Sequence, residues 1–221
     1  MLEAVLKEYS EAIYDTDSDR ALLIVHRAFD CGVSAEDIVF RIVIPSIEQF
    51  LTALIANHNS LAQHFLASQV AAEVVEEMIP RFLQKPESAG KIVIGTSPGD
   101  YHGLGKRIVT GCLKAQMLEV IDLGLNVSAE RYVDAALENN AQVIGISSMM
   151  VHTARGENGC RKVRQILRER GLEGRIKIIV GGAPYRFDEQ LYLQVGADSW
   201  AENGIAAAEA IIGLIREVAS Q

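Results

Sequence analysis

The sequence predicts an α/β protein in which a four-helix bundle precedes a five-stranded parallel sheet of the Rossmann or flavodoxin kind, with helices on both faces of the sheet. Two observations lead to this prediction. Before about residue 85, apolar residues recur at helical spacing and no segment has the pattern of a strand. From Lys91 onward, short apolar runs alternate with amphipathic segments, which is typical of βαβ units and hence of a parallel sheet.

Capping and breaking residues delimit four helices in the N-terminal part. Asp17-Ser18 offers a cap for the second helix, which Gly32 closes. Ser34 caps the third helix, inside which Pro45 should cause a kink or a split. The fourth helix starts near Ser60. The apolar faces of the four are Leu2, Val5, Leu6 and Tyr9; Ala21, Leu22, Ile24, Val25 and Ala28; Ile38, Ile42, Ile47 and Phe50; and Phe65, Val70, Val74, Val75 and Met78.

Residues 85–90, Lys-Pro-Glu-Ser-Ala-Gly, have the composition of a short linker. We therefore expect a helical bundle at 1–84 and an α/β domain at 91–221 that cannot move far apart. In the second domain, strands are expected at 92–95, 118–123, 143–147, 176–180 and 197–200. Helices are expected at 105–115, from Ser128 (with Tyr132, Val133, Ala136 and Leu137 inward), and at 159–171, 187–195 and 204–218.

Charge and composition exclude several classes of partner. The net charge of −8 argues against binding to nucleic acid, which needs clustered Lys and Arg. The basic stretch at 161–170 has apolar residues at helical spacing and is interpreted as the solvated face of a helix. Neither a signal peptide nor the ~18 apolar residues of a membrane span is found. Three distant cysteines argue against disulfides and a zinc site, so we expect a cytoplasmic protein.

The loop after the first strand of the sheet carries the most specific chemistry. Asp100 and His102 stand two residues apart, so the carboxylate can accept a hydrogen bond from one ring nitrogen and raise the basicity of the other. Asp100 can also be a simple helix cap, and the two roles can coexist. Gly103 and Gly105 leave room for a bulky planar ligand. One histidine cannot build a zinc site, but it suits a metal that arrives inside a macrocycle.

Further small and polar residues follow the other strands, and such loops converge at one edge of a doubly wound sheet. They are Ser147-Ser148-Met149, Gly181-Gly182-Ala183-Pro184 and Ala201-Glu202-Asn203-Gly204. Taken alone, each of these segments could merely end a strand or form a turn.

Together, these motifs resemble those of the cobalamin-binding domains of methionine synthase, the B12-dependent mutases and the corrinoid proteins of methyltransferase systems. The shared DxHxxG is matched by Asp100, His102 and Gly105. The second motif, SxL, resembles Ser147-Ser148-Met149 with Met in place of Leu, and the third matches Gly181-Gly182. The wider form, GTxxGDxHxxGKxxV, is also matched by Gly95, Thr96, Gly99, Lys106 and Val109. The helical bundle resembles the cap of the methyltransferase corrinoid proteins, so nearly the whole chain is covered.

The resemblance implies a cofactor, cobalamin (as methylcobalamin or cob(I)alamin) or a related corrinoid, bound base-off and His-on. His102 would be the metal ligand, as the lower ligand to cobalt, and Asp100 would hold its far nitrogen. Thr153 would extend this pair or merely cap a helix, and the nucleotide tail would enter the sheet between the third and fourth strands. The residues expected to bind the cofactor are Asp100, Tyr101, His102, Gly103, Leu104, Gly105, Ser147, Met149, Thr153, Gly181, Gly182, Ala183 and Gly204.

The implied function is that of a methyl carrier, a subunit of a methyltransferase system rather than a complete enzyme. It would accept a methyl group from a donor-side methyltransferase and pass it to an acceptor-side one that acts on tetrahydrofolate or a thiol, with a reductive activase as a further partner. The cap would cover the cofactor between transfers, with 85–90 as a hinge. Two alternatives are a cobalamin-dependent sensor or regulatory module, and the small subunit of an adenosylcobalamin mutase.

This sequence departs from the family pattern at several positions. Gly103 and Arg107 stand where many relatives have Asp and Asn. In the helical part, residues 57–60 and 64–67 replace a common glycine and acidic-proline signature. These departures leave cofactor binding intact, and they favour an O-demethylase system.

Overall fold

The computed structural model describes residues 2–55, 61–82 and 89–220. The chain divides into two compact units, one made of Met1–Glu87 with Lys114–Met117 and the other of Ser88–Leu113 with Leu118–Gln221. Each is described on its own. The expected hinge at 85–90 and the departure at 57–60 lie largely outside the described residues, and both stay predictions.

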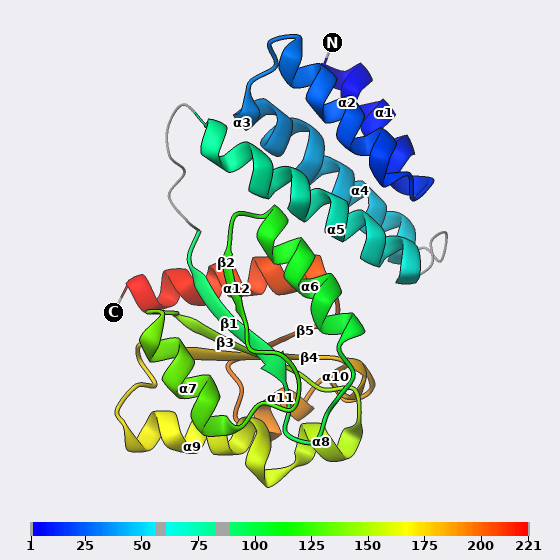
Figure 1. Ribbon diagram of the computed structural model, residues 1–221. Coiled ribbons are helices and arrows are strands. Elements are labelled where there is room, and N and C mark those ends of the chain that lie inside the picture. Colours follow the sequence, from blue (N-terminus) through cyan, green and yellow to red (C-terminus); the bar gives the residue numbers. More distant parts are fainter. Residues whose placement is uncertain (1, 56–60, 83–88, 221) are drawn as a thin grey trace. The chain divides into compact units, whose positions relative to one another are not determined.

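The first unit is helical and contains α1 (Leu2–Tyr14), α2 (Ser18–Asp30), α3 (Ala35–Ile38), α4 (Ile44–Ile55) and α5 (Leu61–Met78), coloured blue to turquoise in Figure 1. The caps of α2 and α3 are formed as expected. Asp17 accepts a hydrogen bond from the Arg20 N–H at 3.0 Å, and Ser34 Oγ accepts one from the Asp37 N–H at 3.1 Å. The core of this unit includes the buried side chains Tyr9, Ile13, Ile38, Ile42 and Met78.

The third expected helix changes its hydrogen bonding just before Pro45. A π-helical turn, Val39–Val43, joins α3 to α4, and the Ile44 N–H donates to the carbonyl of Val39, five residues back. Proline has no N–H to donate, and its ring clashes with the carbonyl four residues back. A π turn is a recognised way to absorb such a mismatch, so the chain continues as a helix through the expected break.

The second unit is built on a five-stranded parallel sheet in the order β2-β1-β3-β4-β5. The strands are β1 (Lys91–Thr96), β2 (Glu119–Asp122), β3 (Val143–Ser147), β4 (Lys177–Gly181) and β5 (Ser199–Ala201). The register aligns their carboxyl ends: Thr96 pairs with Ser147, Ser147 with Gly181, and Gly181 with Ala201. The predicted motif loops therefore leave the sheet at one edge.

Helices cover both faces of the sheet, as Figure 1 shows. On one face, α6 (Leu104–Ala115) and α12 (Gly204–Ala219) pack on β1, β3 and β4 through Leu113, Ile211 and Leu214. On the other face, α7 (Ala129–Glu138) and α9 (Lys162–Glu169) pack through Tyr132, Val133, Val163 and Leu167. This is the predicted α/β architecture, with the flavodoxin strand order.

Three details of this unit differ from expectation. The helix expected at 159–171 starts at Lys162, after a short helix α8 (Val151–Arg155) and a π turn (Glu157–Arg161). The helix expected at 187–195 is two short ones, α10 (Ala183–Phe187) and α11 (Leu191–Gln194). Asp188 separates them, because its backbone is extended and its carboxylate accepts the Gln190 N–H at 3.2 Å. Leu137, expected inward on α7, is exposed.

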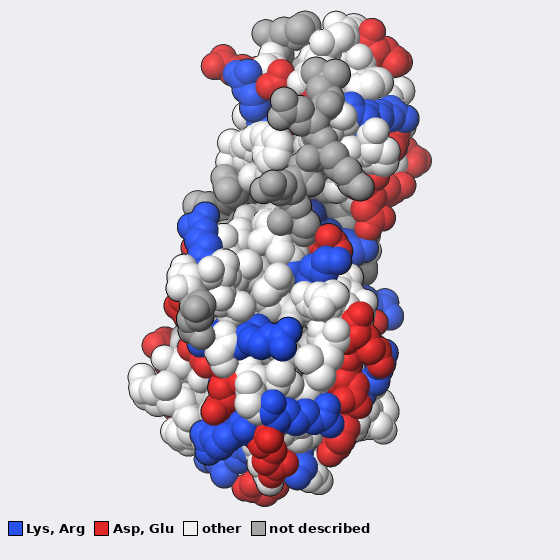
Figure 2. All heavy atoms as spheres, turned by 90° about the vertical axis from the view of Figure 1, so that its left-hand side faces the viewer, with Lys and Arg blue, Asp and Glu red and all other residues white. Residues whose placement is uncertain are grey.

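Basic and acidic side chains are interspersed over the face of the molecule that Figure 2 shows. The basic stretch on and beside α9 follows this pattern, since its four arginines each face a carboxylate. The pairs are Arg161–Glu157, Arg164–Asp198, Arg168–Glu173 and Arg170–Asp134. The stretch is thus a charge-balanced helix surface. In the described part of the chain, no helix combines the length and apolar character needed to cross a membrane.

Candidate functional site

A tight turn links β1 to the Asp-His pair. Pro98 and Gly99 occupy its centre, Gly99 has a φ of 78°, and the Asp100 N–H donates to the carbonyl of Ser97 at 2.9 Å. Proline at the second position and a glycine with positive φ at the third are the signature of a type II turn. The turn reverses the chain at the end of the strand, and Asp100 follows it directly at the carboxyl end of β1.

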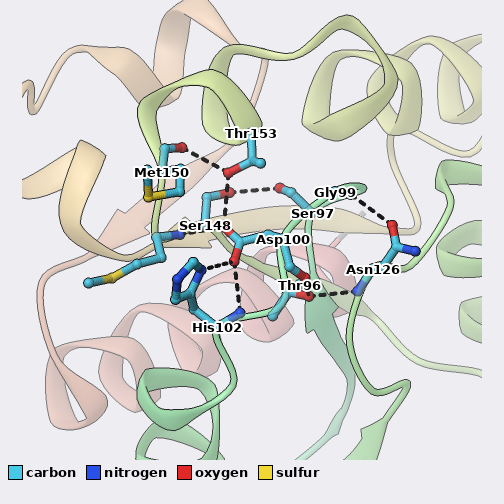
Figure 3. Close-up of polar contacts among 10 residues, drawn as sticks. Thr96, Ser97, Gly99, Asp100, His102, Asn126, Ser148, Met150 and Thr153 are labelled. Atoms are coloured by element: carbon cyan, nitrogen blue, oxygen red, sulfur yellow. Dashed lines mark hydrogen bonds and ion pairs between the residues drawn. The ribbon is translucent and has the colours of Figure 1, made fainter.

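The Asp100 carboxylate is buried and accepts four hydrogen bonds (Figure 3). Oδ1 accepts the backbone N–H of His102 at 3.0 Å and its ring Nδ1–H at 2.9 Å. Oδ2 accepts the Met149 N–H at 2.7 Å and the hydroxyl of Thr153 at 2.9 Å. One carboxylate therefore joins the loop after β1 to the loop after β3.

These contacts decide the charge of Asp100. Burial alone raises the pKa of a carboxyl group. The hydrogen bonds from His102, Met149 and Thr153 stabilise the ionised form more strongly, and together they lower the pKa of Asp100 to about 2. Asp100 is thus an anion throughout the physiological pH range.

The charge of Asp100 fixes the tautomer of His102. An ionised carboxylate only accepts hydrogen bonds, so Nδ1 must carry the ring proton. The lone pair then lies on Nε2, and the imidazole side chain is 57% exposed. The result is a rigidly held imidazole that presents one basic nitrogen to a ligand.

Thr153 shows which of its two expected roles the geometry allows. Its hydroxyl oxygen lies 2.9 Å from Asp100 Oδ2 and 2.8 Å from the carbonyl of Met150. Met150 occupies the N-cap position of α8 and makes no side-chain capping bond, whereas Thr153 lies within the helix. In Figure 3, Asp100 lies between Thr153 and His102.

Two serines that were not singled out for a role hold the loops after β1 and β3 together. The hydroxyls of Ser97 and Ser148, both buried, lie 2.7 Å apart. The Ser148 N–H also donates to the carbonyl of Gly181 at 2.9 Å, which continues the connection to β4. The flanking Ser147 lies in register between β1 and β4, and Met149 is exposed at the rim.

The glycines after β4 permit close approach of backbone segments. Gly182 has a φ of 112°, and a Cβ there would lie 2.0 Å from the carbonyl oxygen of Ser148. At Gly181, a Cβ would lie 3.2 Å from the carbonyl oxygen of Ala201. Ala183 follows as the first residue of α10. At the start of α12, Gly204 is buried, and a Cβ there would lie 2.5 Å from Cys112 Sγ.

The rim around His102 combines apolar side chains with open space. At Gly105, a Cβ would meet no atom within 4 Å, and at Gly103 a Cβ would first meet the Leu125 side chain at 3.1 Å. Large apolar side chains that this unit exposes near the strand ends are Tyr101, Leu104, Leu125, Met149, Met150, Val151 and Phe187. Exposed apolar side chains of this number are typical of a binding surface.

Lys106 and Asn126 make contacts that stabilise the loops around the Asp-His pair. The buried Lys106 ammonium forms an ion pair with Asp122 at the end of β2. In the loop after β2, Asn126 bonds the turn that carries Asp100. Asn126 was missed in the sequence, although an asparagine between Leu125 and Val127 after a strand is a signal for a left-handed turn position.

A family model described as B12 binding domain matches residues 90–211, which is more than half of the chain. The chain is 31% identical over 214 residues to a corrinoid protein of Desulfitobacterium hafniense, covering 95% of this chain and 96% of that protein. It is 33% identical over 210 residues to dimethylamine corrinoid protein 2 of Methanosarcina acetivorans, covering 93% of each chain. The chain belongs to the B12-binding corrinoid proteins of methyltransferase systems.

Solved structures share the fold of this corrinoid protein. A cobalamin-binding protein from Desulfitobacterium hafniense has a TM-score of 0.75 and 23% identity, covering 96% of this chain and 98% of that one. The methanol:cobalamin methyltransferase complex of Methanosarcina barkeri contains a chain with a TM-score of 0.73 and 22% identity, covering 95% of this chain and 80% of that one. The predicted family, fold and cofactor are confirmed.

The residues at the rim fit a corrinoid. Among the residues that the structure describes, no three His, Cys, Asp or Glu side chains gather in a way that could hold a bare metal ion. A single oriented imidazole instead suits a metal whose equatorial ligands all come from a macrocycle. The open space at Gly105 and the apolar rim leave a surface on which such a ring could lie. The oriented imidazole and the rim therefore fit a corrinoid.

Proposed function

We propose that this corrinoid protein carries a methyl group on cobalt between two partner methyltransferases, with His102 Nε2 as the lower axial ligand. The observation that supports this most is the buried Asp100 carboxylate, 2.9 Å from His102 Nδ1. It orients the ring and leaves the basic nitrogen exposed. The other contacts that we assign to the cofactor are those of Tyr101, Gly103, Leu104, Gly105, Ser147, Met149, Gly181, Gly182, Ala183 and Gly204.

A bound corrinoid would supply the chemistry of the transfer, because its cobalt can accept and release a methyl group. The residues of this chain would orient the donor to the cofactor. Asp100 holds the proton on Nδ1, so His102 would offer the lone pair of Nε2. The Thr153 hydroxyl bonds Asp100 Oδ2 and would keep the carboxylate in the position from which it orients the His102 ring.

We assign the nucleotide tail to a slot between β3 and β4. Ser147 pairs with Gly181 at the ends of these strands, and Gly182 packs on the backbone of Ser148. The small residues support this assignment, because no bulky side chain covers the backbone at the ends of these strands. Gly204 at the start of α12 is assigned to the deep end of the slot.

The names of the relatives suggest the class of donor. Several sequence relatives are dimethylamine corrinoid proteins, and a structural relative belongs to a methanol:cobalamin methyltransferase complex. We propose a donor-side methyltransferase for a methylated small molecule, an acceptor-side enzyme acting on tetrahydrofolate or a thiol, and a reductive activase. An O-demethylase system is one member of this class and stays a prediction.

The proposal is tested by methyl loading. Reduced, corrinoid-loaded protein is mixed with the methyltransferase encoded beside it and with methylamines, methanol or a methoxylated aromatic compound in turn. One donor class should convert the cofactor to its methylated form, seen by absorbance. A protein that is purified with an adenosyl group and accepts no methyl group would be a sensor or a mutase subunit instead.

A further inference from the structure

Asn126 connects the loop after β2 to the turn that carries the Asp-His pair (Figure 3). Its backbone N–H lies 2.8 Å from Thr96 Oγ1 and 3.1 Å from the carbonyl of Asp100. Its side-chain Oδ1 accepts the Gly99 N–H at 2.7 Å. The Thr96 hydroxyl in turn donates to the carbonyl of Asp100 at 2.6 Å. Asn126 thus contacts Asp100, which orients His102, and also Gly99, which precedes Asp100 in the turn.

The backbone conformation of Asn126 makes this double contact possible. Its φ is 53°, in the left-handed region that few residues other than glycine adopt without strain. Asparagine tolerates this region better than most side chains. The left-handed conformation turns the N–H and the short side-chain amide toward the same turn, which a residue in an extended strand could not do.

The loop that carries Asn126 is itself anchored. Just before the loop, the last residue of β2, Asp122, pairs with the buried Lys106 ammonium and accepts the Gly124 N–H at 2.8 Å. On the other side, Val127 is buried, and its N–H donates to the carbonyl of Thr96 at 3.1 Å. Asn126 therefore acts from a fixed support, and its contacts restrain the turn rather than merely follow it.

We propose that Asn126 is a positioning residue for the axial histidine. By holding the Gly99 N–H, its side chain fixes the centre of the turn and with it the direction in which Asp100 presents His102. This inference rests on the proposed ligand role of His102. The side-chain bond is separable from the backbone bonds, since glycine keeps the left-handed backbone but has no acceptor.

Three variants isolate the side-chain bond. Asn126→Gly removes Oδ1, whereas Asn126→Asp keeps an acceptor oxygen and should restore the behaviour of the wild type. Asn140→Gly is the matched control, because Asn140 has nearly the same φ of 54° and is exposed in the turn after α7. In the apoprotein, hydrogen exchange of the Gly99 amide measured by NMR should rise about two- to tenfold in Asn126→Gly alone.

The second readout is the cobalt–nitrogen bond. The dissociation constant for cob(II)alamin should rise about two- to tenfold in Asn126→Gly, with a loss of nitrogen splitting in the electron paramagnetic resonance spectrum. Unchanged exchange of the Gly99 amide in Asn126→Gly overturns the role of Asn126. So does an unchanged dissociation constant, provided that the wild-type spectrum shows the nitrogen splitting. A wild-type spectrum without nitrogen splitting overturns the ligand role of His102 instead.

Discussion

At the residue scale, the site depends on one carboxylate that performs two tasks. Asp100 joins two loops through the Met149 N–H and the Thr153 hydroxyl, and it sets the tautomer of His102. Charge-assisted hydrogen bonds of this kind are about twice as strong as neutral ones. The same negative charge therefore stabilises the fold and orients the His102 ring.

This charge should appear in the acid stability of the apoprotein. The pKa of Asp100 is lowered from 3.8 to about 2 in the folded state, so its contribution is present above about pH 4 and is lost as the pH falls toward 2. The difference in free energy of unfolding between wild type and Asp100→Asn should shrink by about 2 kcal/mol over this range. Urea unfolding at several pH values measures it.

A surface aspartate provides the control for this measurement. Asp134 pairs with Arg170 on the exposed faces of α7 and α9, and both side chains are more than 40% exposed. Asp134→Asn should change stability by less than ~1 kcal/mol at any pH. An equal pH dependence of the two variants would mean that Asp100 is not stabilised by its buried hydrogen bonds.

The sequence allowed the Asp100–His102 contact to be predicted, because two residues of one loop must lie close together. It did not allow the contacts that complete the site to be predicted. Ser97 and Ser148 are 51 positions apart, and Gly99 and Asn126 are 27 apart. Such pairs form only when the sheet register aligns the strand ends, and no local pattern encodes them.

At the scale of elements, the strands were predicted within a residue or two, since buried parallel strands are short apolar runs with abrupt ends. The short helices were harder. α8 has five residues, too few for a helical period to be visible, and the backbone at Asp188 breaks the helix expected at 187–195. The glycine pair after β4 was found, but its packing on Ser148 requires the fold.

Gly182 gives a direct test at this scale. In Gly182→Ala, the new methyl group would meet the Ser148 carbonyl oxygen, and the φ of 112° would be strained as well. Strain at positive φ costs about 1–3 kcal/mol, and the clash adds to it. Gly171→Ala is the control, since Gly171 has a φ of 65° with no atom within 4 Å.

The two variants are compared by urea unfolding. Gly171→Ala should lose about 1 kcal/mol and Gly182→Ala clearly more, with weaker corrinoid binding in the latter only. Equal losses would show that the loop after β3 can move away from Gly182 at little cost.

At the scale of the whole molecule, the resemblance stated from three motifs extends over nearly the full length of the relatives. The motifs predicted the cofactor because their spacing follows the strand ends. They did not identify the methyl donor, since the motif residues concern the cofactor site alone.

The assignment of a nucleotide slot also leads to a prediction for the whole protein. Cobalamin in a hundredfold excess over its dissociation constant should raise the free energy of unfolding by about 2.7 kcal/mol. Cobinamide, which lacks the nucleotide tail, should give a smaller increase at the same concentration. Equal stabilisation by both compounds in thermal unfolding would contradict the assignment of the nucleotide tail to a slot between β3 and β4.

The central claim is that His102 binds cobalt, and electron paramagnetic resonance of the cob(II)alamin protein tests it most directly. Protein labelled with ¹⁵N-histidine should change the nitrogen splitting from three lines to two. His102→Ala should lose this splitting, whereas His152→Ala, altered at an exposed histidine on α8, should keep it. A nitrogen splitting that does not change with the label, or that persists in His102→Ala, would contradict the binding of cobalt by His102.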